Sequence, residues 1–418
     1  ALVRQLQGLA RVPLWVAINH EGGSIVHMQG ATVFPSNMAV GATGQPGLAY
    51  EIGRHSAEEL AAMGVNVNLA PVVDVNSEPL NPVIGLRSFG ADPQAVARLG
   101  AEFVRGTQAS GIIAVAKHFP GHGGVSIDSH EALPVALTPA EELWARDVEP
   151  FRAAVEVGVE AVMSAHLAVP TLTGDDLWPA TLSRAAMTGL LRQRLGFQGL
   201  IVTDDLDMKG ITSQLSVGEA AVRAVEAGAD VVLLTRPASQ EAAFQALLAA
   251  ARSGRLSEAR LDESVRRLLA LKAKYGLFET AERWLEVVGS AEHQALARQV
   301  SEAAITVVRA HGLPLVGAQR LLVVSPRTLP PDPDEGWTLF GEEVCRRSAS
   351  CRELLYSPND PASQQEVLSQ ALLLAQEFDQ IIVGLADARL QEAKLGDRTP
   401  FQLVEELAAT GRPLAVVA

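Results

Sequence analysis

Between Pro13 and Thr235 the chain alternates short runs of β-branched residues with amphipathic stretches, and this alternation constrains the fold more than any other feature. We expect strands at about residues 13–18, 66–73, 112–117, 160–165, 199–204 and 229–234. Helical patterns lie between them, at about 45–62, 93–109, 139–157, 183–195 and 216–227. Six consecutive strand–helix units predict a parallel sheet with helices outside it.

Polar residues follow the end of each predicted strand. In chain order they are Asn19, His20 and Glu21, then Asp74, Lys117, His118, His166, Asp204, Asp205, Thr235 and Arg236. A closed (β/α)8 barrel gathers such residues at one rim, whereas a doubly wound sheet spreads them along an edge. The pattern favours an α/β fold with a TIM-type (β/α)8 barrel, whose first strand would be missing before residue 1. The motif G-x-G-x-x-G follows none of these strands, which counts against dinucleotide binding.

The length of 418 residues exceeds what one compact core usually holds, so we expect two domains. Helical patterns at about 239–252 and 257–274 close the first, a catalytic barrel domain over residues 1–278. Residues 279–309 are expected to form a linker. Residues 310–418 would form a smaller α/β sandwich domain, truncated at its end. Its strands are expected near 320–325, 379–384 and 413–418, and its helices near 361–377 and 400–410.

Composition excludes several kinds of partner. The formal charge of −14 and the absence of a long basic run disfavour nucleic acid and anionic membrane surfaces. No apolar run approaches the ~20 residues of a membrane span. The N-terminus lacks a secretory pattern, which favours the cytoplasm, but both ends look trimmed, so the compartment and the oligomeric state stay open. Cys345 and Cys351 are expected to be free thiols.

The stretch from Ile112 to Pro134 carries the densest group of titratable side chains. It begins as a buried strand, turns polar at Lys117, and continues into a glycine-rich loop that contains three histidines and one aspartate. These are His118, His122, Asp128 and His130. A strand that ends in such a loop is typical of a catalytic site in an α/β protein. The alternative is a surface loop in which histidines gather by chance.

Asp204 and the Asp128–His130 pair are the candidate catalytic groups. Asp204 ends a predicted strand, where a carboxylate can act as a nucleophile, a base or a metal ligand; a helix N-cap is the structural alternative. Asp128 and His130 lie two residues apart, so the carboxylate can hold one ring nitrogen and leave the other for proton transfer. A local Asx-turn is the structural alternative for Asp128.

Arg87, Lys117 and His118 are candidate donors at the same rim, suited to sugar hydroxyls or an anion. A surface salt bridge is the alternative for Arg87. His118 and His122 have the spacing of a helical zinc site, but the Pro-Gly pair between them breaks a helix, and no H-x-H ends a strand. We therefore expect neither a metal nor an organic cofactor.

These residues resemble glycoside hydrolase family 3, in its β-N-acetylglucosaminidase branch. KHFPGHGGVSIDSHEALP (117–134) is similar to the KHFPGHG…DSH…LP signature of that branch, which is highly specific. GLIVTDDLDMKGI (199–211) resembles the nucleophile segment of the family. NPVIGLRSFGADP (81–93) and INHEGG (18–23) resemble its sugar-binding loops. The resemblance covers roughly residues 13–278 well and the remaining chain only loosely.

The resemblance implies a retaining hydrolase that releases terminal β-linked N-acetylglucosamine from muropeptide or chitin-type fragments, in carbohydrate metabolism such as cell-wall recycling. Asp204 would be the nucleophile, and His130, paired with Asp128, the general acid/base. A mobile loop around 121–130 would carry this acid to the leaving group. The sugar would be held by Arg87, Lys117 and His118, with Asn19, His27 and His166 as further candidate substrate-binding residues.

Two positions depart from the pattern of the branch: Asn19 stands where an Asp is typical, and His27 replaces an Arg. Losing the charge at position 19 costs about 1–2 kcal/mol, or roughly tenfold in sugar affinity, unless another residue supplies it. Because a His–Asp pair does not repel a second anion as a carboxylate would, a phosphorylase is the nearest alternative, together with a β-glucosidase of the family. A non-catalytic sugar-binding protein and a metallohydrolase are alternatives of other classes.

Overall fold

The computed structural model describes residues 2–174, 177–279, 285–308, 320–327, 340–358, 360–385 and 398–417. It divides into two compact units, residues 1–306 and 307–418, which are described separately.

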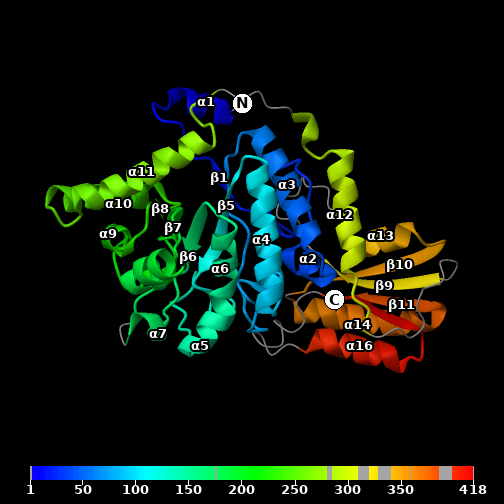
Figure 1. Ribbon diagram of the computed structural model, residues 1–418. Coiled ribbons are helices and arrows are strands. Elements are labelled where there is room, and N and C mark those ends of the chain that lie inside the picture. The colour runs from blue at the N-terminus through cyan, green and yellow to red at the C-terminus, as the bar shows by residue number, and fades with distance from the viewer. Residues whose placement is uncertain are drawn as a thin grey trace. The chain divides into compact units, whose positions relative to one another are not determined.

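The first unit is built on a curled sheet of six parallel strands, each paired with the next in chain order (Figure 1). The strands are β1 (Ala17–Ile18), β4 (Val67–Asn68), β5 (Ile113–Phe119), β6 (Ala161–Ser164), β7 (Leu200–Asp205) and β8 (Val231–Leu233). Each lies within or overlaps a strand expected from the sequence. The α/β fold with a curled, barrel-type parallel sheet is thereby confirmed.

Helices flank this sheet, most of them along its outside, as the amphipathic patterns predict (Figure 1). The main ones are α3 (Pro46–Met63), α4 (Pro93–Ala109), α6 (Glu149–Glu156), α9 (Val217–Ala227), α10 (Pro237–Arg252) and α11 (Glu258–Lys274). Several begin at a side-chain cap: the side chains of Asp92, Ser216 and Ser257 each accept from a backbone N–H of the first turn.

Two predicted helices differ from expectation. The stretch 139–157 is divided into α5 (Ala140–Glu142), a π-helical turn η2 (Leu143–Asp147) and α6. Pro150 explains the division, because it has no N–H and its ring crowds the carbonyl four residues earlier. The second stretch, 183–195, is a π-helix, η4 (Ala185–Arg194).

Further elements of this unit have short or weak sequence patterns. They are α1 (Leu2–Leu9), the antiparallel hairpin β2 (His20–Gly22) and β3 (Ile25–Val26), α2 (Asn37–Thr43), η1 (Gly85–Arg87), α7 (Pro170–Thr173), η3 (Ala180–Leu182), α8 (Lys209–Thr212) and η5 (Leu285–Val287). Within residues 279–309, helix α12 (Ala291–Ala304) packs on α2 and α3. Its Ala297 and Val300 are buried in the core of the unit.

The sheet of the first unit is apolar on both faces, as expected of parallel strands. Ala114, Ala116 and Val162 pack outward against the surrounding helices. Ile113 and Val115 face the other way and pack with Trp15 and with Leu268 and Leu271 of α11. The strands are therefore held from both sides, which fixes the positions of the polar groups at their carboxyl ends.

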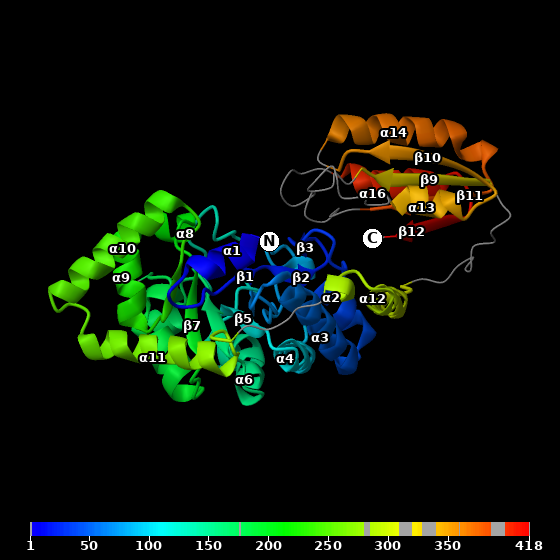
Figure 2. The same ribbon diagram turned by 90° about the horizontal axis from the view of Figure 1, so that it is seen from above.

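The second unit contains a four-stranded parallel sheet in the order β10-β9-β11-β12 (Figure 2). Its strands are β9 (Arg320–Pro326), β10 (Ser350–Tyr356), β11 (Gln380–Gly384) and β12 (Leu414–Val417), and its helical segments are α13 (Phe340–Arg346), α14 (Pro361–Leu374), η6 (Ala375–Glu377) and α16 (Thr399–Ala409). Alternate residues of β9 pack on opposite faces: Leu322 and Val324 against α14 and α16, Leu321 and Val323 against α13. The unit is an α/β sandwich, as expected.

The prediction of two free thiols was wrong. Cys345, near the end of α13, and Cys351, in β10, form a disulfide. The sharp connection between this helix and strand brings their Cα atoms to 5.2 Å, within the range that a disulfide spans. A spacing of six residues does not reveal such a turn.

Within the described residues, none of the helices combines the length and apolar character that a membrane crossing requires.

Candidate active site

A buried ion-pair network joins three segments at the carboxyl ends of the strands. Glu21, in β2, accepts hydrogen bonds from Nε and Nη2 of Arg87, each at 2.8 Å. The Nζ of Lys117, in β5, lies 2.6 Å from Glu21 Oε1 and donates to Asn19 Oδ1 at 2.8 Å. The network holds both cations and Asn19 in fixed positions.

The charges in this network stabilise one another. Burial raises the pKa of Glu21, but Lys117 and Arg87 outweigh burial and bring it to about 2. Burial lowers the pKa of Lys117 more than Glu21 raises it. Glu21 is therefore ionised at neutral pH.

Asp74 organises the turn that follows β5. Its carboxylate, completely buried, accepts from the backbone N–H groups of His118 and His122 at 3.2 and 2.7 Å, and from His118 Nδ1 at 2.7 Å. Because Nδ1 carries the proton toward Asp74, the Nε2 atom of His118 is left for a ligand. Burial raises the pKa of Asp74, but His118 outweighs it, so the pKa lies below the usual value.

Asp204 lies at the end of β7, where its Oδ1 accepts from the N–H of Asp205 at 2.8 Å. Burial raises its pKa, but His118, His166 and Lys117 outweigh burial and lower it. An ionised carboxylate in an electropositive setting is suited to nucleophilic attack. The N-cap alternative does not apply to Asp204, because the following helix α8 is preceded by Met208.

Asp205 and His166 make hydrogen bonds that hold the end of β7 in place. Asp205 Oδ1 accepts from the N–H of Asp207 at 3.0 Å, and its Oδ2 accepts from the Thr235 hydroxyl at 2.8 Å. His166 Nε2 donates to the Asp205 carbonyl at 2.9 Å, and its Nδ1 lies 2.9 Å from Thr181 Oγ1. Burial lowers the pKa of His166 more than Asp204 and Asp205 raise it. Both ring nitrogens of His166 thus lie within hydrogen-bond distance of protein groups.

The structure brings Asp128 and His130 together. Asp128 Oδ1 accepts from His130 Nδ1 at 2.7 Å and from the His130 backbone N–H at 2.8 Å. The His130 side chain is 63% exposed. Its Nε2 atom is therefore left to exchange protons with a substrate or with solvent. The contact combines a local turn at Asp128 with the side-chain pairing expected from the spacing.

Only part of the glycine-rich loop is exposed. The carbonyl of His122 accepts from Asn81 Nδ2 at 2.8 Å, and that of Gly123 from the N–H of Glu78 at 3.1 Å. A Cβ at Gly123 would lie 1.9 Å from the Val75 carbonyl oxygen, so this close approach requires glycine. The exposed part is confined to residues 126–132, in which Ser129 is buried.

The exposed segment is tied to the strand end that carries Asp204. The carbonyl oxygen of Ser129 accepts from the N–H of Gly210 at 3.0 Å. Gly210 lies in α8, six residues after Asp204. A Cβ at Gly210 would lie 3.1 Å from Ser129 O and 3.2 Å from His166 Cβ. The absence of a side chain at this position lets segment 126–132 approach the segment that follows Asp204.

The remaining predicted residue, His27, directly follows β3 and is exposed, so the structure does not bring it into the buried network. Two residues outside the predicted set, Glu21 and Asp74, hold most of the network together. Their position directly after the first and second strands was the available signal. His122 was singled out only as a possible ligand; its buried ring lies edge-on to that of His118, with the centroids 6.2 Å apart.

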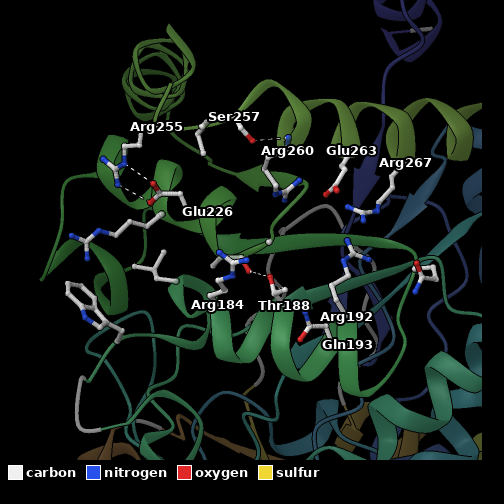
Figure 3. Close-up of a pocket in the computed structure, with 17 residues that line it drawn as sticks. Arg184, Thr188, Arg192, Gln193, Glu226, Arg255, Ser257, Arg260, Glu263 and Arg267 are labelled. Atoms are coloured by element: carbon white, nitrogen blue, oxygen red, sulfur yellow. Dashed lines mark hydrogen bonds and ion pairs between the residues drawn. The ribbon is translucent and has the colours of Figure 1, made fainter. Parts of the chain in front are cut away.

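A groove of about 1020 Å³ lies elsewhere, on the helical side of the first unit (Figure 3). It is lined by six arginines, namely Arg184, Arg192, Arg223, Arg255, Arg260 and Arg267. Most of them are matched by acceptors: Arg255, for example, pairs with Glu219 and Glu226. The groove is thus a surface between helices whose arginines are largely paired with acidic side chains. The predicted site residues are not among those that line it.

Most of the chain is similar to known proteins. Residues 1–271 match the glycosyl hydrolase family 3 N terminal domain. A beta-N-acetylglucosaminidase/beta-glucosidase of Cellulomonas fimi is 37% identical over 321 residues, covering 74% of this chain and 57% of that protein. Beta-hexosaminidase A of Pseudoalteromonas piscicida is 35% identical over 333 residues, covering 74% of this chain and 56% of that protein. The chain thus spans little more than half the length of these relatives.

Solved structures give the same relationship. A family 3 beta-N-acetylglucosaminidase from Paenibacillus sp. str. FPU-7 is similar with a TM-score of 0.89 and 39% identity, over 99% of this chain and 80% of that one. The beta-glucoside phosphorylase BglX is similar with a TM-score of 0.79 and 28% identity, over 92% of this chain and 72% of that one.

Proposed function

Because this chain belongs to glycosyl hydrolase family 3, we propose that it is a retaining exo-β-N-acetylglucosaminidase that acts on muropeptide or chitin-type fragments. One observation carries the proposal. An ionised aspartate at a strand end and an exposed His–Asp pair are joined through the Ser129–Gly210 hydrogen bond, beside a row of buried donors. The relatives named above supply the sugar specificity of the proposal.

The reaction would proceed in two displacements. Asp204 attacks the anomeric carbon while His130 Nε2–H gives its proton to the glycosidic oxygen, which leaves as the alcohol. The product is a glycosyl ester of Asp204. His130 then takes a proton from water, and the oxygen of that water attacks the anomeric carbon and frees Asp204. Asp128 holds the imidazole in the orientation that both steps need and stabilises its protonated form.

The pair replaces the second carboxyl group that retaining glycosidases usually carry about 5–5.5 Å from the first. An imidazole nitrogen can both give and take a proton, as the two displacements require. The segment 126–132 is the part that would adjust when a substrate arrives, since residues 120–125 are fixed by Asp74, Val75 and Asn81.

Binding of the sugar hydroxyls is assigned to Arg87, Lys117 and His118 Nε2, with Asn19 beside them. Glu21 pairs with both cations and fixes their directions, so little side-chain entropy is lost when a sugar binds. Because Asn19 belongs to this sugar-binding group, we expect the substitution at position 19 to modify affinity for the sugar rather than the reaction.

A phosphorylase is the second candidate, favoured by an imidazole in place of a second carboxylate as the proposed base and by the likeness to BglX. Phosphate would then replace water in the second displacement. A β-glucosidase differs only in the sugar, and a non-catalytic binding protein would hold the sugar without turnover.

The test compares nitrophenyl β-N-acetylglucosaminide with nitrophenyl β-glucoside, each with and without inorganic phosphate. We expect faster release from the N-acetylglucosaminide, free N-acetylglucosamine as the product, and no dependence on phosphate. Equal rates on both sugars would contradict the substrate assignment. A sugar 1-phosphate as the main product would establish the phosphorylase, and calorimetric binding without turnover would establish the binding protein.

A further inference from the structure

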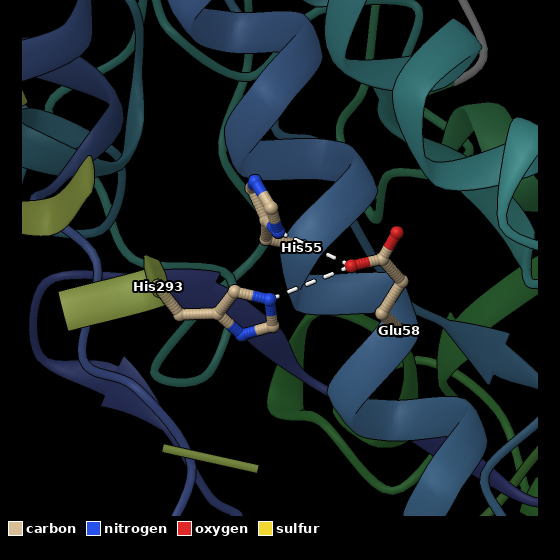
Figure 4. Close-up of side chains that lie close together, drawn as sticks. All are labelled: His55, Glu58 and His293. Carbon is tan, nitrogen blue, oxygen red and sulfur yellow. Dashed lines mark hydrogen bonds and ion pairs between the residues drawn. The ribbon is translucent and has the colours of Figure 1, made fainter. Parts of the chain in front are cut away.

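A histidine and a glutamate one turn apart on α3 face a histidine of α12 within the first unit (Figure 4). His55 Nδ1 lies 3.1 Å from Glu58 Oε2, and His293 Nε2 lies 3.4 Å from the same oxygen. The three ligand atoms all lie within 4.8 Å of one another. His55 is 4% exposed and His293 2% exposed, so the cluster is largely shielded from solvent.

A second carboxylate orients one of these histidines. Glu59 is completely buried and accepts from His293 Nδ1 at 2.6 Å, from the N–H and hydroxyl of Thr32 at 2.7 and 2.6 Å, and from the N–H of Gly289 at 3.1 Å. With Nδ1 donating to Glu59, the Nε2 atom of His293 faces Glu58. A carboxylate that fixes the remote nitrogen of a histidine is the usual outer support of a metal-binding imidazole.

Arg54 is the competing group. Its Nε and Nη1 donate to Glu51 and Glu58 at 2.9 and 2.6 Å, and its Nη2 lies 2.8 Å from His55 Nε2. A cation at the cluster would displace this guanidinium from Glu58, and Glu51, 3.6 Å from His55 Nε2, would then accept the proton of that nitrogen. Arg54 is about one-third exposed and is free to move outward.

We propose that His55 Nδ1, His293 Nε2 and Glu58 Oε2 bind one Zn²⁺ ion, with water completing a tetrahedron. Zinc–ligand distances near 2.0–2.2 Å place neighbouring ligand atoms about 3.3 Å apart, and the two separations at Glu58 already have this size. Two imidazoles and one carboxylate suit zinc better than magnesium or calcium, which prefer oxygen ligands. The ion would join α12 to α3 and stabilise the first unit.

This inference differs from the expectation of a metal-free protein. The sequence presents His55 and Glu58 together, but His293 comes from a distant helix, so the set is visible only in the fold. The proposed ion has a structural role, and the hydrolytic steps assigned to Asp204 and His130 do not involve it.

Zinc binding to the full chain tests the proposal. After removal of metals with a chelator, calorimetric titration should give one Zn²⁺ per chain, and zinc at about 100 times its Kd should raise the Tm by roughly 3–8 °C. Co²⁺ in place of zinc should give the visible absorption of a tetrahedral site.

Three variants make the test specific. Glu58→Gln preserves side-chain size and should weaken zinc binding at least about 10-fold. Arg54→Ala removes the competing guanidinium and should tighten zinc binding. Glu302→Gln, an exposed glutamate of α12, is the matched control and should leave it unchanged.

The proposal is overturned if the chelated wild-type chain takes up no stoichiometric zinc, or if Glu58→Gln binds zinc as tightly as wild type. In the first case the three side chains serve only as a hydrogen-bonded contact between α3 and α12. In the second, zinc binds elsewhere. If Arg54→Ala weakened binding, the guanidinium would be a supporting group, and the assigned ligand set would be wrong. None of these readouts depends on hydrolysis of a sugar.

Discussion

The carbonyl oxygen of Ser129 accepts a hydrogen bond of 3.0 Å from the backbone N–H of Gly210. Ser129 lies between Asp128 and His130, and Gly210 lies six residues after Asp204. This one backbone contact joins the segment that carries the proposed acid/base to the segment that carries the proposed nucleophile. It restrains the segment of the His–Asp pair at Ser129.

Gly210→Ala should disturb that contact. The new Cβ would lie 3.1 Å from Ser129 O and 3.2 Å from His166 Cβ, so segment 126–132 must shift by a few tenths of an ångström. We expect kcat to fall roughly 10-fold, because small displacements of catalytic groups are costly. Gly189→Ala in η4 is the control, since its nearest neighbour in the same comparison is 3.8 Å away. Steady-state kinetics on both variants decide the point, and an unchanged kcat in Gly210→Ala would show that the close approach has no role in catalysis.

Asp204→Asn should remove the nucleophile while keeping the shape of the side chain. We expect turnover of the nitrophenyl N-acetylglucosaminide to fall by about 10³-fold or more. Asp205→Asn is the matched neighbour: its oxygens serve Asp207 and Thr235, and activity should stay within about 10-fold of wild type. Retention of more than a few per cent of activity by Asp204→Asn would remove Asp204 from its proposed role.

His130→Ala should slow the hydrolysis of substrates with a poor leaving group more than that of substrates with a good one. An activated nitrophenolate departs without a proton, whereas a sugar alcohol needs one, so the loss of rate should be about 10²-fold greater for a disaccharide. The measurement is kcat/KM on both substrates. Similar losses on the two would assign the acid to another group.

Glu21→Gln should destabilise the first unit strongly, because it leaves Lys117 and Arg87 buried without their carboxylate. We expect a loss of about 3–5 kcal/mol in the free energy of unfolding, measured in urea at pH 7. Glu302→Gln, an exposed position, should change this free energy by less than about 0.5 kcal/mol. A similar, small effect in both variants would mean that the two cations find other partners.

The same residue predicts a pH dependence. The pKa of Glu21 is about 2 in the folded protein against an ordinary 4.5, so the folded state binds fewer protons than the unfolded state in this range. Its contribution, about 3 kcal/mol, is present above pH 4.5 and is lost as the pH falls from 4.5 toward 2. Wild type should therefore lose more stability than Glu21→Gln over this interval, and parallel curves would contradict the assignment.

The sequence was most informative about the first sheet. Runs such as Ile112–Val115 are β-branched and bounded by glycine or polar residues, a pattern that local propensity alone explains. Strand β10 was not expected, because Arg352 and Glu353 interrupt the apolar pattern of SCRELLY. Its position at the edge of the second sheet tolerates such residues.

The site was predictable in outline only. Strand-end residues such as Asp204 and Lys117 are found by position, and the Asp128–His130 contact is local. The partners Glu21 and Asp74 depend on which loops meet across the sheet, as do both hydrogen bonds of His166, so sequence spacing does not reveal them. The His55–Glu58–His293 cluster requires the packing of α12 on α3.

The open position of His130 has a kinetic consequence. An imidazole that is 63% exposed equilibrates its free nitrogen with bulk water directly. Return of a proton to the acid between catalytic cycles then needs no internal relay of side chains or trapped waters. Buffer species can also reach the same nitrogen. Asp204, at the end of β7, is less exposed than His130, so the two halves of the proposed machinery differ in how open they are to the medium.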